Sequence, residues 1–477
     1  MSWGTVDDID RTAKILVDTN QASNPEEAQR ILRSFVLQVA VGPELADQPA
    51  AQAALATVVN AGARAFLGGV RVRFARDPVL STGWGTGERA SELVQRYGGT
   101  VGHQHLEEYP TLVIGAPTTP VGGPILHLTW NGWAAAVVES PDRLPRGAPG
   151  TELAGVASAA LGVSEAFQHK TGDKLAGRRD VGLSLWRPDL GWSDPEAVGP
   201  RLEYLPAGLW LLGLGHLGQA YAWTLGMLPY ATPEEVLIGL VDFDTVVKGN
   251  TATQLLATPD QVGRPKTRVV AEALEGRGFA TRLVERPFDQ HFHPTAHADP
   301  ARNEPRVALA GFDDVEPRRL LGNSGFDRVV DAGLGRGAEY LDTVIHCFPA
   351  ADDPAVAFGA RPRSRRPLGA AYEAEVERQV AAGHDETSAR CGMLDIAGVT
   401  VGAAFVGALA GALVVADIVR VLHGGESYSV IGIDLRAPDQ CRAALNGSPG
   451  EAALAYTGAR HAPLQQDRAG SSLPRTC

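Results

Sequence analysis

A glycine-rich turn is the first feature of this sequence that suggests chemistry. Gly213, Gly215 and Gly218 follow the apolar residues 209–212 and open a predicted helix. Glycines in this arrangement permit a tight turn, and they allow backbone N–H groups at a helix N-terminus to meet a phosphate. The pattern by itself indicates a nucleotide without specifying which one. A tight strand–helix turn that binds nothing is the alternative.

Acidic and basic residues follow this turn at the ends of later predicted strands. Asp242 and Asp244 end the next strand, where a carboxylate can accept hydrogen bonds from ribose hydroxyls. An NAD-dependent dehydrogenase explains the sequence up to this point. Asn250 and Lys266 come next, and Asp313 ends a further apolar strand. Lysine and asparagine beside a phosphate turn, with an acid suited to Mg²⁺, favour cleavage of a nucleoside triphosphate over hydride transfer.

Taken together, these motifs resemble the superfamily of ubiquitin-activating enzymes and the bacterial adenylyltransferases of thiamine and molybdopterin sulfur carriers (the ThiF superfamily). Its pattern is a glycine loop, D-x-D-x-V-x-x-S-N-L-x-R-Q, G-x-x-K and T-D-N-x-x-x-R. This chain has GLGHLG, DFDTVVKGNTATQ, GRPK and FDDVEPR, in the same order and at closely matching spacing. The resemblance covers residues 206–349 well and extends less closely to about residue 440.

The resemblance implies ATP and Mg²⁺ as cofactors and gives each motif residue a role. Asp242 would hold the ATP ribose beside Asp244 and the glycine turn, while Asn250 and Lys266 would contact the phosphates. Asp313 would bind Mg²⁺ and help to position the carboxylate that attacks the α-phosphate. These roles are carried over from the family pattern to the matching positions of this sequence.

One residue of the family pattern is missing. Thr253 stands where the family has an arginine that neutralises triphosphate charge. Arg264, Arg318 or an arginine from the first half of the chain could replace it, and the sequence does not choose among them. An inactive, degenerate adenylyltransferase is the alternative interpretation.

A cysteine precedes a glycine-rich helix near the end of the chain. Members of the superfamily with a thioester or persulfide step often place a cysteine there, so the resemblance implies a nucleophile at Cys391. Arg390 and His384 lie nearby in sequence and would favour its thiolate. A small buried residue without a chemical role is the alternative. The other cysteines are predicted to be structural or peripheral, and no two cysteines are spaced as a C-x-x-C zinc ligand pair: Cys347, Cys441 and Cys477.

Strands that alternate with helices predict the α/β class. The resemblance implies two Rossmann-like, adenylation-type domains. Residues 1–195 would form a degenerate domain, because they contain no glycine triad, no D-x-D at the end of a predicted strand and no G-x-x-K. Residues 206–349 would form the active ATP-binding domain, completed by a closing helix and strand over 393–445. Residues 350–392 would be a crossover segment that carries the cysteine, and 446–477 a flexible tail. An unrelated accessory domain is the alternative for the first part.

Composition restricts the partners and the location. The chain has 477 residues, of which 44% are hydrophobic and 21% charged, a balance typical of globular proteins. Its net charge of −12 argues against a nucleic-acid or membrane-surface partner. Residues 396–416 are uncharged but rich in alanine and glycine, so we expect a buried helix there rather than a membrane span. The acidic N-terminal segment lacks the pattern of a secretion signal, and we expect a cytoplasmic protein.

The resemblance predicts activation of the C-terminus of a ubiquitin-like protein by adenylation. Thioester formation on a cysteine and transfer to a conjugating-type enzyme would follow, as in bacterial conjugation operons, some of them linked to antiphage defence. Adenylation of a sulfur carrier or peptide terminus without a thioester is one alternative, and a non-catalytic scaffold is another. The oligomeric state stays open between a monomeric pseudodimer and a homodimer.

Overall fold

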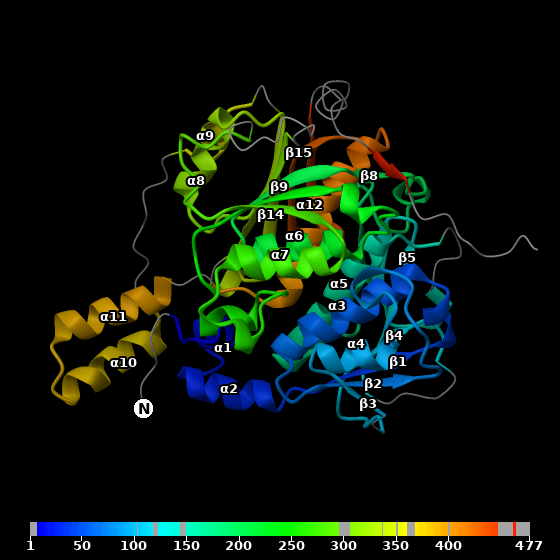
Figure 1. The fold of residues 1–477 in the computed structure, drawn as a ribbon. Helices are drawn as coiled ribbons and strands as arrows, with labels where there is room; N and C mark the ends of the chain where they lie inside the picture. The colour runs from blue at the N-terminus through cyan, green and yellow to red at the C-terminus, as the bar shows by residue number, and fades with distance from the viewer. Residues whose placement is uncertain are drawn as a thin grey trace, which may run out of the picture.

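The computed structural model describes residues 7–102, 104–117, 123–143, 149–294, 306–335, 337–349, 352–359, 368–398, 401–446 and 461–463. Two sheets with helices between them form the protein (Figure 1), which confirms the predicted α/β class with two Rossmann-like units. Cys477 and nearly all of the predicted tail lie outside the described residues.

The first sheet has seven strands in the order β3-β2-β1-β4-β5-β6-β7. The first five strands in this order are parallel to one another. The pairings of β5 with β6 and of β6 with β7 are antiparallel. The strands are β1 (Leu37–Val41), β2 (Val70–Phe74), β3 (Thr100–Val101), β4 (Thr111–Ile114), β5 (Ile125–Asn131), β6 (Ala134–Val138) and β7 (Val181–Ser184). Runs such as LQVAV in β1 are buried on both faces, as is typical of a covered parallel sheet.

The second sheet has eight strands in the order β11-β10-β9-β12-β13-β14-β15-β16. Strands β11 to β13 in this order are parallel, and the last three are antiparallel. The strands are β9 (Gly208–Leu212), β10 (Leu237–Val241), β11 (Ala280–Val284), β12 (Val307–Ala310), β13 (Arg328–Leu334), β14 (Asp342–Pro349), β15 (Tyr428–Asp434) and β16 (Arg442–Leu445). Seven positions therefore repeat the strand order of the first sheet. A separate pair joins β8 (Tyr204–Pro206) to β17 (His461–Pro463).

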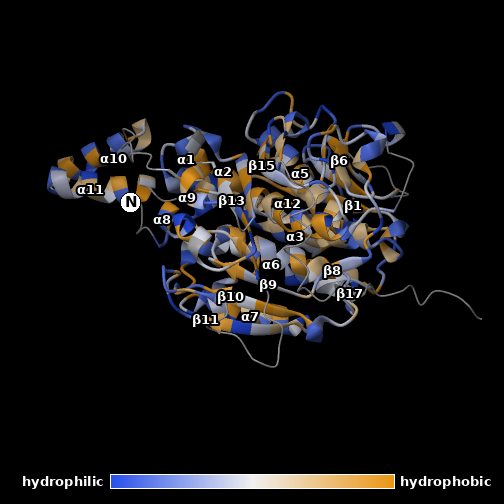
Figure 2. Cartoon of the chain, turned by 90° about the horizontal axis from the view of Figure 1, so that it is seen from above, coloured by the Kyte–Doolittle hydropathy of each residue, from blue (hydrophilic) through white to orange (hydrophobic). Residues whose placement is uncertain are grey.

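Four helices fill the space between the two sheets and contact one another (Figure 1). They are α3 (Pro49–Ala65), α5 (Glu152–Lys170), α6 (His216–Met227) and α12 (Ala404–Leu422). Small residues permit the close crossings, since Gly155 of α5 meets the backbone of Ala50 and Gly411 of α12 meets the backbone of Ala220. Figure 2 shows apolar residues concentrated in this central layer, which forms the core shared by the two halves.

The remaining helices lie around this core. They are α1 (Arg11–Asp18), α2 (Pro25–Arg33), α4 (Ala90–Arg96), α7 (Lys266–Gly276), α8 (Val315–Arg319), α9 (Pro354–Ala357), α10 (Ala370–Ala381) and α11 (Glu386–Gly398). Local sequence explains several starting points, because Asp10 caps α1, Asn24 caps α2 ahead of Pro25, and Thr151 caps α5.

Helix α12 is long and apolar enough to cross a membrane by length and composition alone. However, 94% of its most apolar window is buried inside the protein. Burial between the sheets explains the uncharged sequence, as expected from its alanine and glycine content. Its boundaries differ from the predicted single helix, since the run beginning at residue 396 is divided between the end of α11 and the start of α12.

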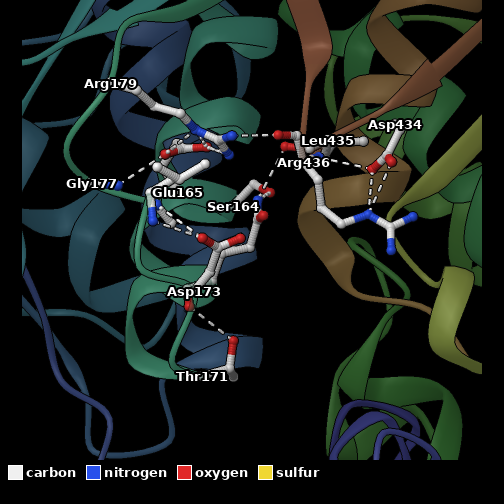
Figure 3. Close-up of polar contacts among 12 residues, drawn as sticks. Ser164, Glu165, Thr171, Asp173, Gly177, Arg179, Asp434, Leu435 and Arg436 are labelled. Carbon is white, nitrogen blue, oxygen red and sulfur yellow. Dashed lines mark hydrogen bonds and ion pairs between the residues drawn. The ribbon is translucent and has the colours of Figure 1, made fainter.

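Arginines that are held by ion pairs within one half donate hydrogen bonds to the other half. Asp417 of α12 pairs with Arg328 at 2.7 Å and with Arg420 at 2.5 Å, and all three side chains are at most 1% exposed. Arg420 also donates to the Leu185 carbonyl of the first half at 2.9 Å. Figure 3 shows a second junction, where Arg179 pairs with Glu165 and donates to the carbonyl oxygen of Arg436. These two hydrogen bonds, from Arg420 and from Arg179, therefore connect the two halves of the chain.

Helices α10 and α11 project from one side of the molecule (Figures 1 and 2). Their base contacts α1, because the Tyr372 hydroxyl donates to Asp18 and the Lys14 ammonium donates to the Ala397 carbonyl at 3.3 Å. Lys14 is 1% exposed and pairs with Asp18 at 2.7 Å. The helix pair is thus attached to the N-terminal part of the chain.

Candidate functional site

A cavity of about 590 Å³ opens at the carboxyl ends of the parallel strands of the second sheet. The strand order reverses between β9 and β12, which is where ligands bind in open α/β sheets. Most of the residues predicted from the sequence line it: Gly213, Gly215, Asp242, Asp244, Asn250, Lys266 and Asp313. Gly218 and Cys391 are not among the lining residues.

The glycine turn joins β9 to α6 and forms the floor of this cavity. Gly213 has a φ of +79°, a conformation that favours glycine. A Cβ atom at Gly218 would overlap the Gly213 carbonyl oxygen, so this glycine allows the helix to start close to the turn. Gly215 is the N-cap of α6 and no side chain caps the helix, so the first-turn N–H groups remain available to an anion.

Asp242 connects the glycine turn to the end of β10. Its carboxylate accepts hydrogen bonds from the Leu214 N–H at 2.6 Å and from the Asp244 N–H at 2.8 Å. Burial raises the pKa of Asp242, while Lys266 opposes this shift. Lys266 begins α7 and pairs with Asp244 at 2.8 Å. Three predicted residues therefore lie together beside the turn.

Asn250 lies in a short 3₁₀ helix, residues Lys248–Ala252, that forms another wall of the cavity. Its side-chain oxygen accepts a hydrogen bond from the Val247 N–H at 3.1 Å, which fixes the amide group locally. Thr253 and Gln254 follow in the same wall. The structure thus brings the residues after β10 to the cavity as the motif order predicted.

Asp313 lies in the loop after β12, and Arg318 holds this loop. The Arg318 Nε donates to the Phe312 carbonyl at 3.0 Å and its Nη2 to the Ala332 carbonyl at 2.7 Å. Arg318 also pairs at 3.4 Å with Asp331, whose side chain is fully buried. Burial raises the pKa of Asp331 to about 7, although Arg318 lowers it. Arg318 therefore links the peptide group before Asp313 to strand β13.

Arg11 of α1 reaches the same cavity from the first half of the chain. Its Nη1 is buried and has no hydrogen-bond partner among the described residues. Burial lowers the pKa of Arg11, while Asp7 and Asp313 oppose the shift. Of the other two candidate arginines, Arg264 pairs with Glu272 and does not line the cavity. Arg318 lines the cavity, but it donates to the Phe312 and Ala332 carbonyls. The arginine donated by the first half is thus the one with a buried, unpaired donor at the cavity.

Two protein-family models match this chain: the BilD N-terminal domain over residues 36–185 and the BilD C-terminal domain over residues 205–425. The bacterial E1-like protein BilD of Collimonas sp. (strain OK412) is 36% identical over 434 residues. The alignment covers 89% of this chain and 90% of that protein. The chain belongs to the BilD family of bacterial E1-like proteins.

Solved structures with a similar arrangement are more distant from this BilD-family chain. E. coli MccB with ATP is 12% identical, with 67% of this chain and 94% of that chain covered and a TM-score of 0.32. PaaA is also 12% identical, with 50% of this chain and 63% of that chain covered and a TM-score of 0.32. This chain therefore spans less than two thirds of PaaA, and likenesses of this size carry no conclusion about function.

Cys391 is exposed on α11, outside the cavity wall. Arg390, expected to favour the thiolate, instead makes a two-pronged ion pair with Glu373 of α10 at 2.9 and 3.0 Å. That carboxylate compensates its charge. The end of the same helix, Gly398, does line the cavity, so α11 leads from the cysteine to the cavity wall.

The corresponding place in the first sheet holds a carboxylate. Glu44 follows β1 and accepts a hydrogen bond at 3.0 Å from the Ala116 N–H, which follows β4. A Cβ atom at Gly42 or Gly115 would overlap the Glu44 side chain. This negative charge lies between the two strand-end loops where a phosphate would have to bind. The Glu44 carboxylate would repel a phosphate at this place.

Arg11 and His216 are among the cavity residues that sequence reasoning did not identify. His216 is the first residue of α6, and burial lowers its pKa to about 4, so its ring is neutral at pH 7. A Cβ atom at Gly402 or Gly407 would overlap the ring, so these two glycines make room for it. The position of His216 inside the glycine motif GLGHLG is a sequence signal that could have identified it as a cavity residue. Nothing in the sequence around Arg11 distinguishes it from the other arginines of the chain.

Proposed function

We propose that this chain activates the carboxyl terminus of a ubiquitin-like protein by adenylation with MgATP. The observation that carries the proposal is the convergence, at one cavity, of the glycine turn, Lys266, Asp313 and Arg11, whose Nη1 has no hydrogen-bond partner among the described residues. The cavity volume of about 590 Å³ falls within the range of about 300–1,000 Å³ found for small-molecule sites. Membership of a family of E1-like proteins supports the same reaction class.

The charges around the cavity fit a triphosphate with a magnesium ion. Arg11 and Lys266 supply positive charge, and the uncapped start of α6 supplies N–H donors. Among the described residues no group of three His, Cys, Asp or Glu side chains could hold a metal ion by itself. That fits Mg²⁺, which is usually held by one or two carboxylates together with substrate phosphates. Asp313 would be the carboxylate, and the bound ion would neutralise phosphate charge.

In the proposed first step, a terminal carboxylate oxygen of the carrier attacks the α-phosphorus of ATP. A new oxygen–phosphorus bond forms, the bond to the β-phosphate oxygen breaks, and pyrophosphate leaves. This chain would act by positioning the two reactants and by neutralising charge. Asp242 would orient the ribose, while Arg11 and Lys266 would stabilise the negative charge that develops on the leaving pyrophosphate.

In the proposed second step, the Cys391 thiolate attacks the carbonyl carbon of the acyl-adenylate. A carbon–sulfur bond forms, the carbon–oxygen bond to AMP breaks, and AMP leaves with the electron pair. The thioester would then pass to a conjugating-type enzyme. The exposure of Cys391 supports access for such a partner.

Adenylation without a thioester is a second candidate function, and two observations favour it. Cys391 lies outside the cavity wall. Arg390 is paired with Glu373, so its positive charge is not available to stabilise a Cys391 thiolate alone. Under this candidate, the acyl-adenylate itself would be the species that reacts with an acceptor.

The first step is tested by ATP–pyrophosphate exchange with a ubiquitin-like protein that binds this chain. We expect exchange with the wild type, strong loss with Lys266→Ala, and retention with Lys248→Ala. Lys248 is the matched control because it is nearby but 73% exposed and does not line the cavity. Absence of exchange in the wild type, under conditions where the carrier binds, would refute the proposed function.

The second step is tested by a reducible carrier adduct on denaturing gels. Cys391→Ala should abolish the adduct and preserve exchange, while Cys441→Ala should change neither. Cys441 is a suitable control because burial raises the pKa of its thiol to about 12, which makes it a poor nucleophile. An adduct that survives Cys391→Ala would refute the thioester assignment, and normal exchange without any adduct would favour the second candidate function.

A further inference from the structure

Arg64 binds the back of the cavity wall although it belongs to the other half of the chain. It lies in the last turn of α3, and its Nε donates to the Gln254 carbonyl at 3.2 Å. Its Nη2 donates to the Ala257 carbonyl at 3.1 Å and to the Leu255 carbonyl at 3.4 Å. A single guanidinium therefore holds three backbone carbonyls of one short segment.

A second residue of α3 supports the same segment. The Asn60 Nδ2 donates to the Leu255 carbonyl at 2.9 Å, and the Asn60 carbonyl accepts from the Arg64 Nη1 at 2.9 Å. Asn60 is completely buried. The two side chains lie one helical turn apart, so α3 presents both to residues 254–257 as one rigid unit.

This segment continues directly from the residues that line the cavity. Gln254 itself lines the cavity, and its side-chain oxygen accepts from the Gln219 Nε2 at 2.7 Å. The Gln219 Oε1 accepts from the Leu256 N–H at 3.0 Å. Gln219 belongs to α6, the helix that the glycine turn opens. Residues 254–257 are thus held on one side by Gln219 of α6 and on the other by Arg64 of α3.

The charge of Arg64 has no compensating carboxylate within the described part of the chain. Burial lowers the pKa of Arg64 to about 10, so the side chain is still protonated at neutral pH. A partly buried guanidinium that only carbonyl oxygens satisfy is costly for stability, whereas a methionine would fill a similar volume without that cost. Retaining an arginine here is reasonable if the carbonyls must be held in one conformation.

We propose that Arg64 is a positioning residue that fixes, from the first half of the chain, the loop that presents Asn250, Thr253 and Gln254 to the cavity. The proposal rests on the proposed function in one respect, namely that the ligand of this loop is the triphosphate of MgATP. The degenerate half thereby contributes to the site in two ways: Arg11 enters the cavity, and Arg64 supports its wall.

The test compares Arg64→Met and Arg64→Lys with Arg179→Met. Arg179 is a matched control because it is a partly buried arginine that joins the two halves and does not line or support the cavity. Calorimetric titration with MgATP should show binding weakened about tenfold in Arg64→Met, since its bonds to three carbonyls are lost, and a smaller loss in Arg64→Lys. Arg179→Met should lower the melting temperature but leave the MgATP affinity within about twofold.

Amide hydrogen exchange without nucleotide gives the second measurement. The amides of residues 250–257 should exchange faster in Arg64→Met than in wild type. Their exchange rates should be the same in Arg179→Met as in wild type. If Arg64→Met does not fold, Asn60→Ala replaces it, with a smaller effect expected on the same amides. Equal protection and equal MgATP affinity in wild type and Arg64 variants would overturn the proposal. A wild type that does not bind MgATP, with loss of protection confined to the Arg64 variants, would refute the proposed function and retain the positioning role.

Discussion

Replacing Arg11 by methionine should separate the stability of the empty protein from its ability to bind nucleotide. Arg11 keeps a buried Nη1 without a hydrogen-bond partner among the described residues, and such a donor costs about 1–3 kcal/mol. The attraction of Arg11 to Asp7 and Asp313 offsets part of this cost. We therefore expect Arg11→Met to raise the free energy of unfolding of the nucleotide-free protein by about 1 kcal/mol.

Nucleotide binding should change in the opposite direction. A hydrogen bond from an arginine to a phosphate contributes about 1.5–3 kcal/mol, which corresponds to a loss of about 10- to 150-fold in MgATP affinity. Urea unfolding and calorimetric titration measure the two quantities on the same preparation. Arg30→Met on the adjacent helix α2 is the control, because Arg30 is 73% exposed and pairs only with Glu27 in the described structure. An Arg11→Met protein that is less stable and binds MgATP as tightly as wild type would refute this account of Arg11.

Three further predictions concern the scaffold. Gly218→Ala should weaken MgATP binding at least about tenfold in a titration, because the new Cβ overlaps the Gly213 carbonyl and moves α6 away from the turn; unchanged affinity would contradict this. Asp417→Ala leaves two buried guanidinium groups without their carboxylate, so urea unfolding should show a loss of about 3–5 kcal/mol, and a loss below 1 kcal/mol would be inconsistent with the buried triad. Because the folded pKa of Asp331 is raised to about 7, its contribution to stability is complete below pH 4 and is lost as the pH rises towards 7. Wild type should therefore lose up to about 4 kcal/mol relative to Asp331→Asn between pH 4 and pH 8, and parallel pH profiles would show that Asp331 does not titrate in this way.

The glycine turn and the strand ends could be predicted because their signals are local. A glycine triad after an apolar strand specifies a turn and a helix start, and β10 ends at Val241 because the apolar run ends there, just before Asp242. Parallel strands then bring these ends to one edge of the sheet, so separate motifs meet without further information.

The role of the first half could not be predicted in the same way. Arg64 reaches the second half of the chain because α3 packs in the central layer, and Arg11 reaches it because α1 packs against residues 248–252. Neither residue has a sequence motif around it. Glu44 is likewise unremarkable in sequence, although its carboxylate lies between the two strand-end loops of the first sheet. The pairing of Arg390 with Glu373 depends on how α10 folds back on α11, which neighbouring residues do not reveal. Contacts between distant elements thus account for what the sequence left open.

A structure of this protein with MgAMPCPP, which keeps the triphosphate intact, would test the central claim most directly. We predict the triphosphate on the turn between Gly213 and Gly218, with Arg11 and Lys266 within hydrogen-bond distance of its oxygens and the α-phosphate facing Asp313. A nucleotide bound elsewhere, or one in this cavity with Arg11 turned away from the phosphates, would contradict the claim that both halves of the chain build one adenylation site.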